Sequence, residues 1–361
     1  MITSCLNRAS VGAALIGALT MASASLLAAE PKTVEEIANY KGTDRQALLE
    51  SGAKKEGSLL VYTVGSQTDP MFKRFTEKYP YIRLEAYKAD STDITRRVIE
   101  EYTANKFIVD SIDLSTGGLH PLKDAGVLQP YYSSETAAYA PGTVDPDNAW
   151  VLDYLGYVGL GYNTDAVKAD DVPKTWDDVM NPKWKGLMAL SGRGSTMSNW
   201  VGAVIRDGGE SLVRKLGQQQ FKVYQVSAKA IANLVVSGEV PLSPQIFKAH
   251  MANSADKGAR VKWRAIGGVY ANVNAVALAK KAPHPNATML YIDFTLSKEG
   301  QEMRLKIGND SGRVDLATED KPAKIYYLSE ERDYDTNFEK WTTLAREVFG
   351  KPVVDPNIKD E

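Results

Sequence analysis

The stretch from Leu59 to Tyr79 restricts the possible folds more than any other part of this sequence. A short apolar, β-prone run, residues 59–63, stops at Gly65, and Asp69-Pro70 then opens an amphipathic segment with aromatic residues at helical spacing. A strand, a loop and a helix in this order are typical of an open α/β sheet. Ligands of such sheets bind beyond the carboxyl ends of the strands, so the loop is predicted to lie near a ligand. An ordinary strand-to-helix turn is the alternative.

The alternation of strands and helices continues along the chain. Residues 81–87 alternate as a strand, residues 91–105 form a helical pattern with capping residues before it, and residues 107–114 indicate a buried strand. A helix through Leu122 then precedes another short apolar run. This β-α-β-α-β order predicts an α/β fold with a mostly parallel sheet.

Two later runs of extended character stand apart from this pattern. They cover residues 150–163 and 262–279, and the first is rich in Tyr, Leu, Val and Gly. Such a run indicates chain that passes from one lobe to another. The whole chain has 361 residues, which is enough for two lobes, each with its own core.

Residues 1–29 have the composition of an export signal. Arg8 supplies the positive charge, residues 11–21 are almost wholly apolar, and small residues follow. Residues 22–24 form one possible cleavage site, and the junction before Glu30 is another. Because the apolar run is too short to span a bilayer, we predict a cleaved signal and a periplasmic mature protein. A retained membrane anchor is the alternative.

Cysteine content and charge exclude several classes of function. The only cysteine, Cys5, falls inside the predicted signal, so we expect neither disulfides, nor cysteine-based zinc sites, nor a cysteine nucleophile. The chain has 43 Lys and Arg against 45 Asp and Glu. This balance gives no general attraction to nucleic acid, and a charged ligand must therefore be held by a local site.

The sharpest local motif is Ser-Gly-Arg-Gly-Ser-Thr at residues 191–196. Its two glycines allow the backbone to approach a ligand, the hydroxyls of Ser195 and Thr196 donate hydrogen bonds, Arg193 adds a charge, and a helix is predicted to follow. This pattern suits an oxyanion such as phosphate, phosphonate, sulfonate or carboxylate. The motif lacks the Gly-Lys-Ser/Thr ending of a nucleotide P-loop. A glycine-rich turn with a helix cap is the alternative.

No set of residues predicts catalysis or metal binding. His120, His250 and His284 are the only histidines, and none has a metal-ligand partner two to four residues away. Asp110 and Asp113 fall on opposite faces of a strand, which argues against joint acid–base work. There is no nucleophile elbow. We therefore expect no enzyme, no catalytic residue, no cofactor and no metal site.

Several motifs together resemble one family. The chain resembles periplasmic solute-binding proteins of ABC importers, in the group that contains the ferric-ion-binding proteins, over nearly all of its mature length. The motifs that carry the resemblance are LLVYTVGSQTDP, VDSIDLSTGG, YNTDAV, the Trp-Asp-Asp…Pro-Lys-Trp-Lys-Gly segment and SKEGQ. The resemblance implies a type II periplasmic binding protein fold, with two α/β lobes, two crossing hinge strands and a ligand cleft between the lobes.

The resemblance also implies boundaries and a binding site. Lobe one is expected to comprise residues 30–155 plus 272–361, and lobe two residues 156–271, with crossings near Gly156–Asn163 and Gly267–Ala275. The segments expected to face the cleft are Gly65–Thr68, Ser115–Gly117, Gly192–Thr196, Ser227 and Ser243–Phe247. The predicted ligand-binding residues are Ser66, Gln67, Ser115, Thr116, Arg193, Gly194, Ser195, Thr196, Ser227, Gln245 and Tyr270.

The sequence departs from the ferric binders at their metal ligands. Those proteins use a histidine and an acidic residue from lobe one and adjacent tyrosines from lobe two. Here Gln67 and Ser115-Thr116 occupy the lobe-one positions, and residues 245–249 contain no tyrosine. A ferric ion needs anionic oxygen ligands. The anion-binding part of the site, residues 194–196, looks retained.

We therefore expect a monomeric periplasmic receptor for a small organic anion, which delivers the solute to an inner-membrane ABC permease by hinge closure. The alternative is uptake of ferric or another metal ion through ligands that do not match the family pattern. The tyrosine pairs Tyr131-Tyr132 and Tyr326-Tyr327 are candidates for such ligands, or simply packing residues. An exported enzyme on the same fold, or a sensor that docks on a membrane receptor, are further alternatives.

Overall fold

The structure is a computed structural model that describes residues 31–361, apart from 65–67, 194, 317–321, 329–332 and 360–361. The predicted export signal, residues 1–29, lies outside the described residues. Residues Lys32–Glu361 form one compact unit. Within the described ranges, no helix is both long enough and apolar enough to cross a bilayer.

Within the described residues, nine strands form one sheet, whose main path is β2-β1-β3-β10-β5-β8. Its strands are β1 (Ser58–Thr63), β2 (Arg83–Lys88), β3 (Ser111–Ser115), β4 (Leu128–Gln129), β5 (Trp150–Asn163), β8 (Leu242–Phe247), β9 (Val261–Arg264), β10 (Val269–Ala279) and β11 (Ile325–Tyr326). The strands β1, β2 and β3 pair in parallel, whereas β10 runs antiparallel to both β3 and β5. The parallel pairing of the first three strands follows the expected pattern. The prediction of a mostly parallel sheet is wrong, because β5 and β10 return antiparallel to most of their neighbours and most strand pairs of this sheet are antiparallel.

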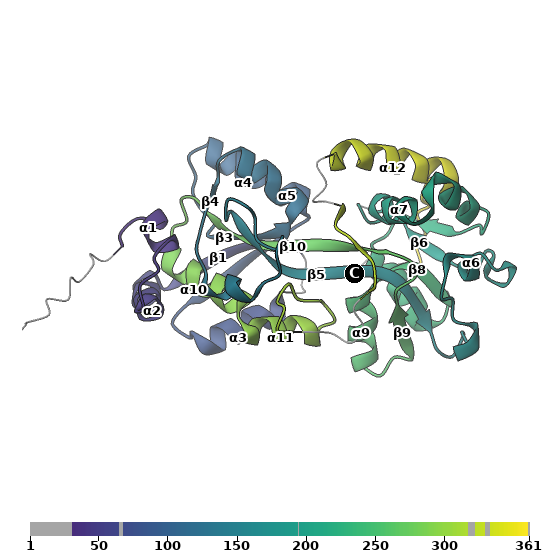
Figure 1. Cartoon of the computed structure of the whole chain (residues 1–361), viewed down its shortest axis with the longest axis horizontal. Coiled ribbons are helices and arrows are strands. Elements are labelled where there is room, and N and C mark those ends of the chain that lie inside the picture. The colour runs from purple at the N-terminus through teal and green to yellow at the C-terminus, as the bar shows by residue number, and fades with distance from the viewer. Residues whose placement is uncertain (1–30, 65–67, 194, 317–321, 329–332, 360–361) are drawn as a thin grey trace, which may run out of the picture. The chain divides into compact units, whose positions relative to one another are not determined.

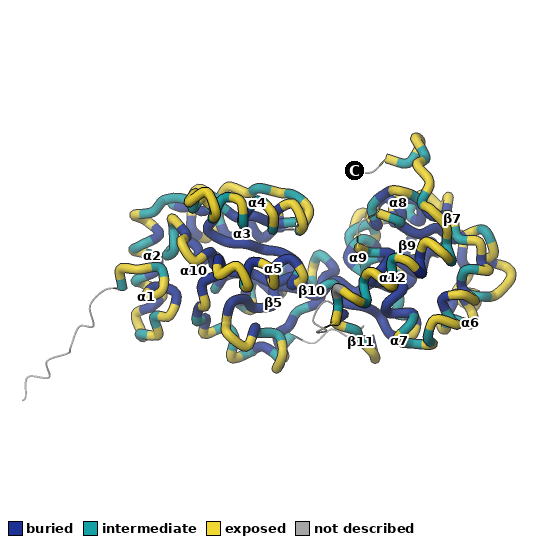
Figure 2. The backbone as a smooth tube through the Cα atoms, turned by 90° about the horizontal axis from the view of Figure 1, so that it is seen from above, coloured by how far each residue is buried: buried dark blue, intermediate teal, exposed yellow. Residues whose placement is uncertain are grey.

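The strands β5 and β10 pass between two hydrophobic cores (Figure 1). The first core takes Val151 from β5 and Val276 from β10. The second takes Leu160 from β5 and Tyr270 from β10. In the view of Figure 2, these strands are mostly buried, and the exposed residues lie mainly on helices and loops around them. The two cores define lobe one and lobe two, and the expected two-lobed fold with two crossing strands is confirmed.

Helices cover both faces of the lobe-one strands (Figure 1). The elements of lobe one are α1 (Val34–Ala38), α2 (Arg45–Glu56), α3 (Asp69–Lys78), α4 (Ser91–Thr103), α5 (Thr116–Asp124), η1 (Ser134–Ala138), α10 (Pro285–Leu296) and α11 (Lys298–Lys306). Those around lobe two are η2 (Ala169–Asp171), α6 (Trp176–Val179), η3 (Pro182–Trp184), β6 (Ala189–Ser191), α7 (Thr196–Gly217), β7 (Lys222–Tyr224), α8 (Ala228–Ser237), α9 (Lys248–Asp256) and α12 (Tyr334–Phe349).

The C-terminal helix α12 packs on α7 (Figure 1). Trp341 of α12 belongs to the same core as Trp200 of α7. A Cβ at Gly202 would stand 2.8 Å from the Trp341 ring, so the two helices approach closely at this glycine. The expected lobe boundaries remain a proposal, and this packing argues that the lobe-one segment that begins at residue 272 ends before α12.

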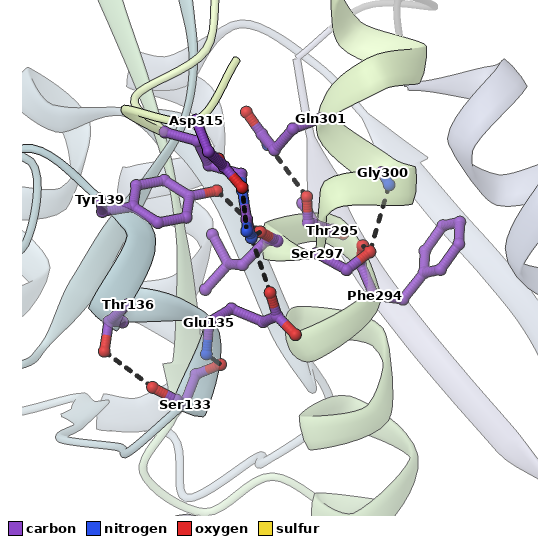
Figure 3. Close-up of polar contacts among 12 residues, drawn as sticks. Ser133, Glu135, Thr136, Tyr139, Phe294, Thr295, Ser297, Gly300, Gln301 and Asp315 are labelled. Carbon is purple, nitrogen blue, oxygen red and sulfur yellow. Dashed lines mark hydrogen bonds and ion pairs between the residues drawn. The ribbon is translucent and has the colours of Figure 1, made fainter.

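The Ser-Lys-Glu-Gly-Gln motif builds the junction between α10 and α11 (Figure 3). The hydroxyl of Ser297 accepts from the backbone N–H of Gly300 at 3.2 Å. Gln301 donates to the carbonyl of Thr295 at 2.9 Å and to the carbonyl of Asp153 on β5 at 2.7 Å. The motif therefore fixes two helices to a crossing strand, and its role in the fold is structural.

Candidate ligand cleft

A cavity of about 610 Å³ is lined by residues of both lobes and of the crossing strand β10. Lobe one contributes residues 90–93 and Ser115, and β10 contributes Asn272 and Asn274. The residues from lobe two are Arg193, Ser195, Thr196, Ser227, Ala228, Lys229, Phe247 and His250. A cavity of this volume is typical of sites for small organic molecules.

Four helices begin at this cavity. Ser91 is the first residue of α4, and Ser115, Ser195 and Ser227 are the residues just before α5, α7 and α8. Small polar residues are favoured at such positions because they can cap the helix. Each helix N-terminus carries a partial positive charge and backbone N–H groups without partners inside the helix. The cavity therefore collects backbone donors from both lobes.

The hydroxyls at these helix starts differ in their bonds. Ser227 accepts from the N–H of Ala230 at 3.2 Å, so it caps its own helix. Ser115 and Ser195 make no side-chain cap bond. The hydroxyl of Ser115, just before α5, lies 3.1 Å from the hydroxyl of Ser91 at the start of α4. The side chains of Ser115 and Ser195 are thus not committed to capping, which leaves them able to contact a ligand.

Charged side chains in the cavity are divided between the lobes. The cations Arg193 and Lys229 come from lobe two, and the carboxylates Asp90 and Asp93 come from lobe one. Burial, together with a smaller effect of the charge of Lys229, lowers the pKa of His250 to about 4. The imidazole is therefore neutral above this pH and adds no charge to the site.

The structure brings five of the predicted binding residues into the lining, namely Ser115, Arg193, Ser195, Thr196 and Ser227. Three others, Ser66, Gln67 and Gly194, lie outside the described residues. Thr116, at the start of α5, is almost fully buried and does not line this cavity.

Two further predicted residues, Gln245 and Tyr270, do not line the cavity. Gln245 is fully buried, and its carbonyl oxygen accepts from the N–H of Ser191 at 2.6 Å. Tyr270 belongs to the lobe-two core and lies within hydrogen-bond reach of Thr196. Burial raises the pKa of Tyr270, so its phenol stays protonated. Gln245 and Tyr270 thus contact Ser191 and Thr196, and neither is among the residues that line the cavity.

Several residues that line the cavity are not predicted from the sequence. Asn272 and Asn274 are the clearest, because they are polar residues two apart in an otherwise apolar strand. A period of two places both on one face, so this pattern could have revealed them. Lys229 and His250 gave no comparable signal, because their place in the cavity depends on how α8 and α9 pack.

Among the described residues, no group of three or more His, Cys, Asp or Glu side chains is arranged to hold a metal ion. Of the tyrosine pairs, Tyr131 donates to the carbonyl of Val276 at 2.8 Å inside the lobe-one core, and Tyr326 donates to Asp207 at 2.7 Å. Neither tyrosine lines the cavity.

A family model for bacterial extracellular solute-binding proteins matches residues 114–326. This match covers more than half of the chain, and the chain belongs to that family. A curated relative, the iron uptake protein A1 of Synechocystis sp., is 23% identical over 196 residues. The match spans 50% of this chain and 54% of that protein, so the chain matches about half the length of this relative.

Solved structures of other binding proteins share the fold. The substrate binding protein of an ABC transporter from Agrobacterium tumefaciens gives a TM-score of 0.66 at 18% identity, over 82% of this chain and 97% of that one. Iron-bound HitA from Pseudomonas aeruginosa gives a TM-score of 0.62 at 18% identity, over 81% of this chain and 99% of that one. The structure of AfuA from Actinobacillus pleuropneumoniae, with exogenous fructose-6-phosphate bound, gives a TM-score of 0.59 at 20% identity. The match covers 81% of this chain and 96% of that one.

Proposed function

We propose that this protein is the substrate-binding component of an ABC importer, which captures a solute in the periplasm and delivers it to an inner-membrane permease. The proposal is supported by the family to which the chain belongs and by a cavity lined from both lobes. A solute that contacts both lobes stabilises the closed arrangement over the open one, because only the closed form offers both sets of contacts.

For the solute, our first candidate is a small organic anion. The observation that carries it is the convergence of four helix N-termini on one cavity, with Arg193 and Lys229 beside them. Backbone N–H groups at helix starts, hydroxyls and cations all favour negative charge. AfuA, whose structure contains a sugar phosphate, has the same fold.

Ferric iron is the second candidate, and the names of similar proteins give it more support than they give a free anion. The Synechocystis relative is an iron uptake protein, and HitA is iron-bound. Asp90 and Asp93 supply carboxylates to the cavity, and hard cations prefer such oxygen ligands. Against this candidate, the described residues that line the cavity include no tyrosine.

The experiment that separates the candidates is calorimetry of the purified, metal-free protein. The titrants are compounds with phosphate, phosphonate, sulfonate or carboxylate groups, and ferric citrate with citrate alone as its control. The first candidate predicts that an anion binds without metal. Binding of iron alone, with a visible absorption band from charge transfer, would instead establish the second candidate.

The site is tested by the Ser195→Ala/Thr196→Ala double variant. A hydrogen bond to a charged group contributes about 1.5–3 kcal/mol, so loss of one bond weakens binding roughly tenfold to a hundredfold. Thr343→Ala is the matched control, because Thr343 is an exposed α12 residue whose hydroxyl donates only to the Glu339 carbonyl at 3.0 Å. Unchanged anion affinity in the double variant would remove the proposed site.

A further inference from the structure

Asn274 is one of the residues that line the cleft. It lies on β10, opposite Ser115 of β3 and Tyr154 of β5. Its side chain lines the cavity, although the residue is only 3% exposed. Neither its amide oxygen nor its amide nitrogen has a hydrogen-bond partner among the described residues. Buried amides are nearly always paired in proteins, so an unpaired one at a ligand cavity indicates a group that pairs with ligand.

Strand geometry directs this amide towards the cavity. Asn272 and Asn274 both line it, as expected for residues two apart on one face of a strand. Val273, between them, belongs to a hydrophobic cluster on the other face. The pairing of β10 with β5 shifts register directly after Asn274, and such irregularities re-aim side chains next to binding sites.

Two further polar groups without partners lie next to this face. The Nδ1 atom of His250 and the Nδ2 atom of Asn309 have no hydrogen-bond partner among the described residues, and Asn309 is only 2% exposed. Both residues line a second cavity of about 200 Å³. This cavity shares Asn272 and Phe247 with the main one, so the two are neighbours. The cleft therefore continues into a small, mostly apolar cavity in which Asn272, His250 and Asn309 supply uncharged polar groups.

We propose that Asn274, together with Asn309 and His250, forms a second subsite that binds hydroxyl groups, so that the solute is a hydroxylated organic anion. This inference rests on the proposed anion-binding function. The acidic group is held at the helix N-termini, and the hydroxyls contact the crossing strand. An amide offers both donors and an acceptor, and a hydroxyl matches it because it also donates and accepts. An apolar group at this place leaves the amide unpaired and is disfavoured.

Matched pairs of anions test the proposal by calorimetry. Glycerol 3-phosphate is compared with propyl phosphate, and citrate with propane-1,2,3-tricarboxylate, because each pair differs only in hydroxyl groups. We expect the wild-type protein to prefer the hydroxylated member of a pair by about tenfold or more. In Asn274→Leu the preference falls severalfold, while affinity for the member without hydroxyls is retained. Asn337→Leu on α12, outside both cavities, serves as the control and keeps the preference.

Thermal unfolding separates a binding role from a structural one. Replacing an unpaired buried amide by an apolar group of similar shape leaves stability unchanged or raises it, whereas a structural amide lowers it when lost. Three results would overturn the subsite and leave anion binding intact. They are equal binding within both pairs, an unchanged preference in Asn274→Leu, and a lowered melting temperature of that variant without ligand. Failure of all four anions to bind overturns the anion function and the subsite together.

Discussion

The buried ion pair between Arg304 and Asp153 gives the strongest prediction for stability. Arg304 of α11 is fully buried, and its guanidinium contacts both carboxylate oxygens of Asp153 on β5. It also lies 4.5 Å from the ring centroid of Tyr154. Apart from this arginine, the carboxylate has one weak hydrogen bond among the described residues, donated by Gln301 at 3.4 Å. The pair therefore holds α11 against a strand that runs through both lobes.

The perturbation is Arg304→Met, which keeps much of the apolar stem but removes the charge. Asp153 is then left as a buried carboxylate without a counter-ion. Removing one partner of a buried pair costs about 3–5 kcal/mol, because the remaining charge has lost its compensation. We expect a loss of this size at pH 7, which lowers the ratio of folded to unfolded protein by about two to four orders of magnitude.

The loss should depend on pH in a defined direction. Burial raises the pKa of Asp153, and Arg304 opposes this rise. Without the arginine the pKa rises further, so the folded state holds a proton that the unfolded state releases, and stability falls as pH increases. The destabilisation of Arg304→Met is therefore expected to be smaller at pH 5 than at pH 8.

Urea unfolding followed by circular dichroism and tryptophan fluorescence measures the effect. The matched control is Arg214→Met, whose half-exposed guanidinium contacts Glu210 and Glu347 on the surface. An exposed pair contributes about 0–1 kcal/mol, so this variant should resemble the wild type. If Arg304→Met also lies within about 1 kcal/mol of the wild type at pH 7, the argument from desolvation is refuted.

Two further predictions concern the cores. Burial raises the pKa of Asp113 to about 7, despite hydrogen bonds donated by Tyr291 and Ser111. The wild-type protein should therefore lose stability as pH rises from about 4 to 7. The variant Asp113→Asn should flatten this dependence in urea titrations at several pH values. A dependence that Asp113→Asn leaves unchanged must come from other groups. Gly202→Ala introduces a Cβ 2.8 Å from the Trp341 ring and should destabilise lobe two by about 1–3 kcal/mol, measured by thermal unfolding. A melting temperature equal to that of the wild type would show that α12 can move away from α7 without loss of stability.

The sequence predicts the elements whose signals are local. Residues 59–63 and 81–87 show strand patterns, and the structure places β1 and β2 there. The run at residues 150–163 coincides with β5, because its length and composition require a buried strand. The loop at residues 191–196 could be recognised because glycines and hydroxyls before a helix have a direct physical meaning.

Features that depend on packing between distant segments could not be predicted in the same way. Helix α12 follows lobe-one elements in the chain, yet its apolar face fits α7 of lobe two. The position of Gln245 in the chain predicts a contact with the ligand, and only the structure shows that its side-chain oxygen accepts a hydrogen bond from the backbone of Ser191. The spacing of Asn272 and Asn274 could have marked one polar face of β10, but that the amide of Asn274 is unpaired among the described residues is visible only in the structure.

If the solute is the proposed anion, the placement of the helix N-termini links its binding to closure. The helices α4 and α5 belong to lobe one, whereas α7 and α8 belong to lobe two, and all four begin at the same cavity. Without a ligand, the like partial charges of these helix N-termini repel each other across the cleft, and attraction between the lobe-one carboxylates and the lobe-two cations offsets this repulsion. An anion between them reverses the sign of the interaction, because each lobe is then attracted to the same charge. A net charge of −2 on the whole chain does not prevent this, since the attraction comes from backbone groups within one turn of the ligand.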